Sequence, residues 1–244
     1  MLNNVRWNII DVFKVFLFYF LMMQIGIPAL LWIIKEMLGL DLIESLGNNV
    51  VVLSLSLFVN ILTCIYIFYI IRDGYGLSIK SLGFTANDWK ADVKFGLKRY
   101  FIVLPVIIFA GYVADYALRF FGLVPEQQEI LKKFLEEESL AVLTFMVSFG
   151  VLAAPIMEEL VFRGFLQSAV RNVLGKQKAI LVSGLLFAIV HLDVYIFLQI
   201  FILGLLLAYL FEKTGSLIAP ITVHIFHNSA TIAIILSLDR IIYD

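Results

Sequence analysis

The amino-acid sequence predicts an all-α protein, a polytopic transmembrane bundle of about seven to eight helices. Hydrophobic residues make up 62% of the chain and charged residues only 15%, and the mean hydropathy is +0.99. A soluble globular domain cannot bury that much apolar surface. Runs of about 20 apolar residues recur, each long enough to cross a hydrocarbon core roughly 30 Å thick. Only five prolines interrupt the 244 residues, which suits long helices.

Seven spans are predicted from the apolar runs, at about 13–34, 50–71, 100–121, 140–157, 178–192, 194–211 and 217–238. The first run is too long and too aromatic for a signal peptide, and no small-residue cleavage site follows it, so we expect an uncleaved span. The fifth run is short. Residues 158–173 look like a helix that continues the fourth span past Pro155, so an eighth membrane-embedded or interfacial segment is compatible with the pattern.

Lysine and arginine predict the orientation of the chain. Basic residues collect after the second span, in 72–99, and after the fourth, in 163–178. In the loop after the third span, the positive charges are offset by five glutamates, Glu126, Glu129, Glu136, Glu137 and Glu138. The positive-inside rule then predicts a multi-pass protein of the cell membrane with a cytoplasmic N-terminus. We expect segment 72–99 to be a cytoplasmic loop with a short amphipathic helix.

Other classes of protein receive little support from the composition. The net charge of −1 gives no reason to expect a nucleic-acid partner, and the single cysteine, Cys64, excludes an internal disulfide. Asn60 and Asp115 lie within the second and third spans. We expect each to be an interhelical hydrogen-bonding group or an end-of-span residue.

An acidic motif interrupts the fourth apolar stretch. On a helix, Glu159 and Arg163 are four residues apart, so they share a face and can form an ion pair. Glu158 is rotated from Glu159 by about 100° and points elsewhere. The motif therefore predicts one neutralised carboxylate and one that remains available for proton transfer. Pro155 followed by acidic residues is also the pattern of an ordinary helix start.

The three histidines, His191, His224 and His227, lie in the last apolar stretches. Phe187 and His191 are four residues apart, so the phenyl ring can form a wall beside the imidazole. His224 and Asn228 share a face in the same way, and their N–H groups are the two donors that a developing oxyanion requires. His227 is displaced from His224 by about 60°, and it is either a neighbour of the site or an outward structural residue. Packing and helix–helix hydrogen bonding are the alternative roles of these clusters.

The combination of the clusters indicates chemistry. An ionisable residue at the bilayer centre costs roughly 2.5–3.5 kcal/mol on insertion scales. Three polar clusters on three helices each need partners, and facing one another is the least costly arrangement. Together they provide a carboxylate base, an imidazole and two oxyanion donors, which are the groups needed to hydrolyse an amide with activated water.

The order Glu-Glu-x-x-x-Arg, Phe-x-x-x-His, His-x-x-x-Asn on successive apolar helices resembles the CAAX prenyl protease and bacteriocin-processing family, also called the Abi family. The resemblance covers roughly residues 140–235. It implies an intramembrane endopeptidase that acts on a membrane-associated peptide or protein within the lipid bilayer. Its catalytic residues would be Glu158, His191, His224 and Asn228, with Glu159 and Arg163 in support. The chain would then be one integrated membrane domain, with N-terminal helices in 1–135 and a catalytic core in 136–244.

The preferred mechanism needs no cofactor: Glu158 takes a proton from water that His191 helps to hold, while His224 and Asn228 stabilise the oxyanion. In a zinc-dependent alternative, Glu158, His191 and His224 bind the metal and leave a position open for water. Against it, the chain lacks His-Glu-x-x-His. Two further alternatives are a proton or ion pathway in a transporter, which predicts repeat symmetry that we do not find, and a non-catalytic scaffold or immunity partner.

Overall fold

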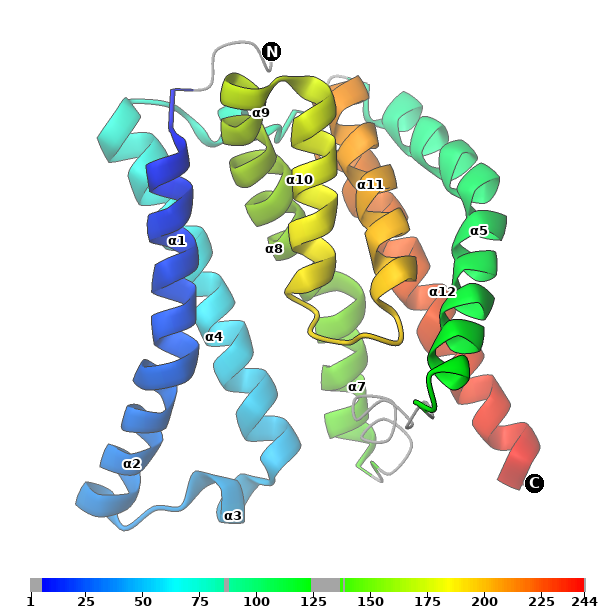
Figure 1. Cartoon of the computed structure of the whole chain (residues 1–244). Helices are drawn as coiled ribbons and strands as arrows, with labels where there is room; N and C mark the ends of the chain where they lie inside the picture. Colours follow the sequence, from blue (N-terminus) through cyan, green and yellow to red (C-terminus); the bar gives the residue numbers. More distant parts are fainter. Residues whose placement is uncertain (1–5, 86–87, 124–136, 138, 244) are drawn as a thin grey trace.

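The computed structural model describes residues 6–85, 88–123, 137 and 139–243, and it shows the predicted all-α bundle (Figure 1). Within the described residues, six helical segments are long and apolar enough to cross a membrane: Ile9–Leu38, Val50–Gly74, Trp89–Phe120, Leu140–Leu174, Phe197–Thr214 and Ile218–Ser237. The chain is therefore a multi-pass integral membrane protein.

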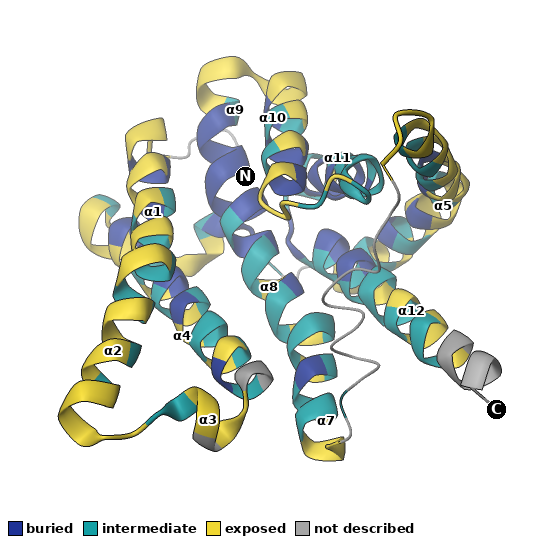
Figure 2. Ribbon diagram, turned by 60° about the horizontal axis from the view of Figure 1, so that its bottom comes forward, coloured by how far each residue is buried: buried dark blue, intermediate teal, exposed yellow. Residues whose placement is uncertain are grey.

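The N-terminal part contributes helices α1 (Ile9–Leu21), α2 (Ile27–Leu38), α3 (Leu42–Leu46), α4 (Asn48–Tyr69) and α5 (Trp89–Phe120). The C-terminal part contributes α7 (Leu140–Ser148), α8 (Ala154–Glu159), α9 (Ser168–Leu174), α10 (Lys176–Ile189), α11 (Phe197–Thr214) and α12 (Ile218–Tyr243). Buried residues concentrate in 159–170, up to the start of α9, and on the inward sides of α10 and α11, whereas α2 is mostly exposed, as expected of a helix that contacts lipid (Figure 2).

The two basic segments that the sequence predicts on one side of the membrane lie at the same end of the bundle. The start of α1, the start of α5 and the connection between α9 and α10 lie at one end of the bundle (Figure 1), so the two basic segments are on the same side. The segment 72–99 differs from the expectation in part, because residues 89–99 form the first turns of α5. Most of the glutamate-rich loop, at 124–136 and 138, lies outside the described residues, and so does the predicted boundary near residue 135.

Helix α10 is shorter than the fifth span that the sequence predicts at 178–192. It has 14 residues, which corresponds to a length of about 21 Å, less than the roughly 30 Å of a hydrocarbon core. The hairpin that it forms with α11 turns well short of the far ends of α7 and α12 (Figure 1). The described residues thus contain six candidate membrane-crossing segments where the sequence predicts seven, and the fifth, which the sequence already marks as short, is the one that is missing. The turn after Ile189 is as apolar as the helix before it, so hydropathy alone does not show where the helix ends.

The short helix α10 has one consequence for function: its C-terminal end at Ile189, two residues before His191, lies within the depth of the bundle. Leu192, the next residue, has a φ of 52°, a left-handed conformation that is uncommon for residues other than glycine. The chain thus reverses sharply at this point, and the imidazole is presented at the turn of the hairpin.

Two glycines allow α10 and α11 to pack closely. A Cβ atom on Gly184 would lie 3.0 Å from the main-chain nitrogen of Leu205, and one on Gly204 would lie 3.0 Å from the carbonyl oxygen of Gly184. Small residues at such contacts are typical of helices that associate in membranes, because they let the backbones approach. The hairpin therefore depends on these two positions.

Replacing Gly184 with alanine is expected to lower the melting temperature in detergent. The added methyl group would overpack main-chain atoms, which costs about 1–3 kcal/mol, and turnover should fall as well because α10 positions His191. Gly74→Ala is the matched control, since a Cβ there would meet nothing within 4 Å. If the two variants melt at the same temperature, close packing of the hairpin is not required.

Helix α1 is anchored to the fourth membrane-crossing segment by Trp7. Its side chain is 1% exposed, its Nε1–H donates to the carbonyl oxygen of Phe165 at 2.9 Å, and the two rings stack at 5.7 Å. The helix then starts with a capping box formed by Asn8 and Asp11, and the Tyr75 hydroxyl donates to the Asp11 carboxylate. These contacts hold α1 beside the residues of the candidate site.

Candidate active site

The acidic motif lies on one long helix that contains two wide turns. Between Leu140 and Leu174 the helix passes through π-helical segments at Phe149–Ala153 and Leu160–Gln167. The predicted continuation of the fourth span past Pro155 is therefore confirmed. Pro155 lies just after the first π-helical segment, inside this continuous helix, and its missing N–H leaves a carbonyl group of the preceding turn without its helical hydrogen bond. Wide turns of this kind are frequent at functional sites, because they release carbonyl groups from the regular helix pattern.

The predicted ion pair between Glu159 and Arg163 is present and fully buried. Arg163 Nη1 donates to Glu159 Oε1 at 3.0 Å, and both side chains are 0% exposed. Arg163 Nη2 donates to the Gly204 carbonyl oxygen on α11 at 3.1 Å, and the guanidinium lies over the Phe187 ring at 4.4 Å. The ion pair thus joins the acidic helix to the α10–α11 hairpin.

His224 reaches this ion pair from α12. Its Nδ1 lies 2.9 Å from Glu159 Oε1, and its Nε2 lies 3.7 Å from Glu158 Oε2. A carboxylate can only accept a hydrogen bond, so Nδ1–H of His224 donates to Glu159 and Nε2 is the nitrogen directed toward Glu158. Spacing along the chain did not predict the contact with Glu159, because the two residues are 65 positions apart.

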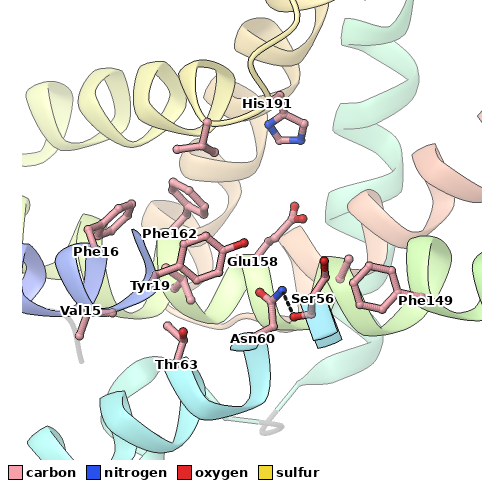
Figure 3. A pocket seen from close by; sticks show the side chains of 13 residues that line it. Val15, Phe16, Tyr19, Ser56, Asn60, Thr63, Phe149, Glu158, Phe162 and His191 are labelled. Atoms are coloured by element: carbon pink, nitrogen blue, oxygen red, sulfur yellow. Dashed lines mark hydrogen bonds between the residues drawn. The ribbon is translucent and has the colours of Figure 1, made fainter. Parts of the chain in front are cut away.

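Glu158 points away from the ion pair and into a cavity of about 320 Å³ that it shares with His191 (Figure 3). Its side chain remains 29% exposed, in contrast to the buried Glu159. The structure therefore places the two adjacent glutamates in the different environments that their helical rotation predicts.

His191 is held by its own helix. Its Nδ1 lies 2.6 Å from the Phe187 carbonyl oxygen, and because a carbonyl oxygen only accepts, Nδ1 carries the proton and Nε2 is left with a lone pair in the neutral ring. The Phe187 ring meets the rings of His191 and His224 edge to face, at 4.7 and 5.5 Å. Phe187 is thus a wall for both imidazoles and for Arg163.

Asn228 and His227 take different positions on α12. The Asn228 amide nitrogen donates to the Gly150 carbonyl oxygen at 2.9 Å, within the first π-helical segment, and the residue does not line the cavity. His227 Nδ1 lies 3.0 Å from the Tyr100 hydroxyl on α5. The structure brings together Glu158, Glu159, Arg163, Phe187, His191 and His224. It gives Asn228 a partner on the first π-helical segment and His227 a partner on α5.

Sequence reasoning missed the wall of the cavity that the N-terminal helices provide. Helix α1 contributes Val15, Phe16 and Tyr19, and α4 contributes Ser56, Asn60 and Thr63. Positions 56, 60 and 63 repeat every three to four residues, so they share one face of a helix. This polar stripe was a usable signal. Asn60 was expected to be only an interhelical or end-of-span group, whereas it lines the cavity.

The zinc alternative requires ligands that lie close together among the described residues. No group of three His, Cys, Asp or Glu side chains among them is arranged to hold one. We therefore derive no step through a metal.

Comparison with known proteins agrees with the motif order. The model of the family described as Type II CAAX prenyl endopeptidase Rce1-like matches residues 140–230, which include every candidate residue from Glu158 to Asn228. No curated protein and no solved structure matches the chain. The chain therefore carries, over residues 140–230, a domain of the Rce1-like type II CAAX prenyl endopeptidase family, which is a family of proteases.

Proposed function

We propose that the protein is an intramembrane endopeptidase that hydrolyses a peptide bond in a membrane-associated peptide or protein. One observation carries the proposal: Glu158 and His191 face a common cavity, while the neighbouring Glu159 is bound by Arg163 and His224. An available carboxylate and an imidazole beside the same space are the groups that activate water for attack on a carbonyl carbon.

In the proposed reaction, Glu158 takes a proton from a water molecule that also hydrogen-bonds to His191 Nε2. The resulting hydroxide attacks the scissile carbonyl carbon and forms a tetrahedral oxyanion. When the C–N bond breaks, Glu158 returns the proton to the leaving nitrogen, so the carboxylate is regenerated and one water molecule is consumed. Glu159 does not compete for the proton, because Arg163 and His224 occupy it.

Two groups on α12 are the proposed oxyanion donors. The Nε2 of His224 is directed toward the Glu158 side of the site and donates when the ring carries a proton on both nitrogens, and Asn228 has a second amide hydrogen besides the one that it donates to Gly150. Hydrogen bonds aimed at a developing oxyanion stabilise the transition state more than the bound substrate. His224→Ala should therefore reduce turnover more than His227→Ala, since the His227 imidazole contacts Tyr100 instead.

A cleavage assay tests the proposed function. The purified protein, in lipid vesicles, is given a peptide that ends in Cys-aliphatic-aliphatic-X, with and without a farnesyl thioether on the cysteine. We expect mass spectrometry to find a single internal cut in at least one of the two peptides. If correctly folded protein leaves both intact, the proposed function does not apply to this class of substrate.

Removal of metal ions separates the two proposed chemistries. With water, a carboxylate, an imidazole and fixed donors as the only reacting groups, activity is expected to survive prolonged chelation, with far less than one equivalent of zinc in the active protein. Stoichiometric zinc that is lost together with activity, and restored with it, would instead establish the zinc-dependent alternative at Glu158, His191 and His224.

A further inference from the structure

We infer that Tyr19 of α1 and Asn60 of α4 form a binding site for the main chain of the substrate, on the wall of the cavity opposite Glu158 and His191. The identity of the substrate as a peptide rests on the proposed function. Both residues lie outside the part of the chain that the family model matches. The N-terminal helices would therefore complete the active site rather than only support it.

Asn60 presents hydrogen-bonding groups to the cavity. Asn60 lines the cavity, and its Nδ2 donates one hydrogen to the Ser56 carbonyl oxygen of its own helix at 2.9 Å. An amide group has two N–H donors and a carbonyl acceptor, so a second N–H and the oxygen Oδ1 remain. An asparagine in a membrane helix usually bonds a neighbouring helix. Here the side chain is directed into the space beside Glu158 (Figure 3).

Tyr19 presents a hydroxyl group to the same cavity. Its side chain lines the same cavity as Asn60 and Glu158. Figure 3 shows the hydroxyl directed toward the same space as the Glu158 carboxylate. A tyrosine hydroxyl both donates and accepts. The pair Tyr19 and Asn60 thus offers one donor and one acceptor side by side, the pattern that a peptide group needs.

The membrane gives a physical reason for such a pair. A peptide segment that enters a low-dielectric cavity loses the water bonded to its N–H and C=O groups, and each unsatisfied group costs several kcal/mol. Much of the remaining lining is apolar, with Phe16 and Phe162 among its residues, and cannot replace that water. We assign the Tyr19 hydroxyl as donor to a substrate carbonyl oxygen and Asn60 Oδ1 as acceptor for a substrate N–H.

The test measures binding separately from cleavage. Fluorescent peptides with the farnesylated sequence described above are titrated against the protein in lipid nanodiscs, in a Glu158→Gln background that prevents turnover. Tyr19→Phe keeps the ring and removes only the hydroxyl, and Asn60→Leu keeps the size of the side chain. Tyr69→Phe on α4 is the matched control, because that ring is 60% exposed and outside the cavity. Melting temperatures are recorded for all variants.

We expect Tyr19→Phe and Asn60→Leu each to weaken binding by about 2- to 12-fold, the usual range for one neutral hydrogen bond, and Tyr69→Phe to leave it unchanged. A set of peptides with a single ester in place of one peptide bond then locates the contact. At one position beside the scissile bond, the ester should itself weaken binding and remove the effect of Asn60→Leu, because the N–H that Asn60 accepts is already missing.

Each other outcome overturns either this inference or the proposed function. Unchanged binding in both variants, or an equal loss with every ester peptide, would overturn the binding site and leave cleavage by Glu158 intact. If Glu158→Gln cleaves as well as the wild-type protein while the ester pattern holds, the proposed mechanism fails and the binding site stands. If neither the wild-type protein nor Glu158→Gln binds the peptides, both are overturned for this substrate class.

Discussion

Replacing Glu158 with glutamine is expected to lower kcat by about 10²–10⁴-fold, the contribution of a positioned general base. Glutamine has nearly the same size and fills the same place in the cavity, but it cannot take a proton from water. Because the Glu158 side chain is 29% exposed and its contact with His224 Nε2 is as long as 3.7 Å, the variant should insert and fold as the wild-type protein does. Initial rates of peptide cleavage, measured at equal amounts of folded protein, provide the check.

The matched control for this variant is Glu36→Gln, an exposed carboxylate at the end of α2. It removes one negative charge without changing the cavity, and its turnover should equal that of the wild-type protein. Near wild-type cleavage by a well-folded Glu158→Gln protein would contradict the assignment of Glu158 as the base.

Replacing Arg163 with alanine is expected to destabilise the protein by about 3–5 kcal/mol, the cost of leaving one partner of a buried ion pair unpaired. The Glu159 carboxylate would stay at 0% exposure with only His224 beside it, and the hydrogen bond to Gly204 would be lost. The melting temperature in detergent should fall markedly, and turnover should fall with it because His224 is no longer fixed.

The exposed pair Asp115 and Arg119 is a matched control, because it has the same spacing of four residues. Its side chains are 46% and 59% exposed, and exposed ion pairs contribute about 0–1 kcal/mol, so Arg119→Ala should melt close to the wild-type protein. The double variant Glu159→Gln, Arg163→Met should regain much of the lost stability, since no buried charge is then unpaired. If Arg163→Ala and Arg119→Ala melt at the same temperature, burial does not increase the contribution of the Glu159–Arg163 pair to stability.

Local geometry explains what the sequence predicted well. Glu159 and Arg163 pair, and Glu158 diverges from them, because the period of a helix fixes which residues share a face. The wall that Phe187 forms beside His191 follows from the same spacing. In each case, the partners are four residues apart or adjacent, so no knowledge of the tertiary structure was required.

Contacts between distant segments could not be predicted in the same way. His224 bonds Glu159 across 65 positions, and Asn228 bonds a carbonyl group that a π-helical turn releases at Gly150. The sequence identified both residues as donors, but their partners depend on how α12 packs against the acidic helix. The contribution of Tyr19 has no sequence signal at all, because a single tyrosine in an apolar run is ordinary, and only the anchoring of α1 by Trp7 brings it to the cavity.

Isotope labelling tests the central claim most directly, namely that water activated by Glu158 cuts the peptide bond. The wild-type protein is mixed, in water enriched in ¹⁸O, with slightly less than one equivalent of the peptide substrate, so that each enzyme molecule turns over at most once. Both the product and the protein are then analysed by mass spectrometry. We predict one ¹⁸O atom in the new carboxylate of the product and none in the Glu158 side chain. An unlabelled product, with ¹⁸O in the Glu158 carboxylate, would contradict the account, because Glu158 itself would then have attacked the substrate.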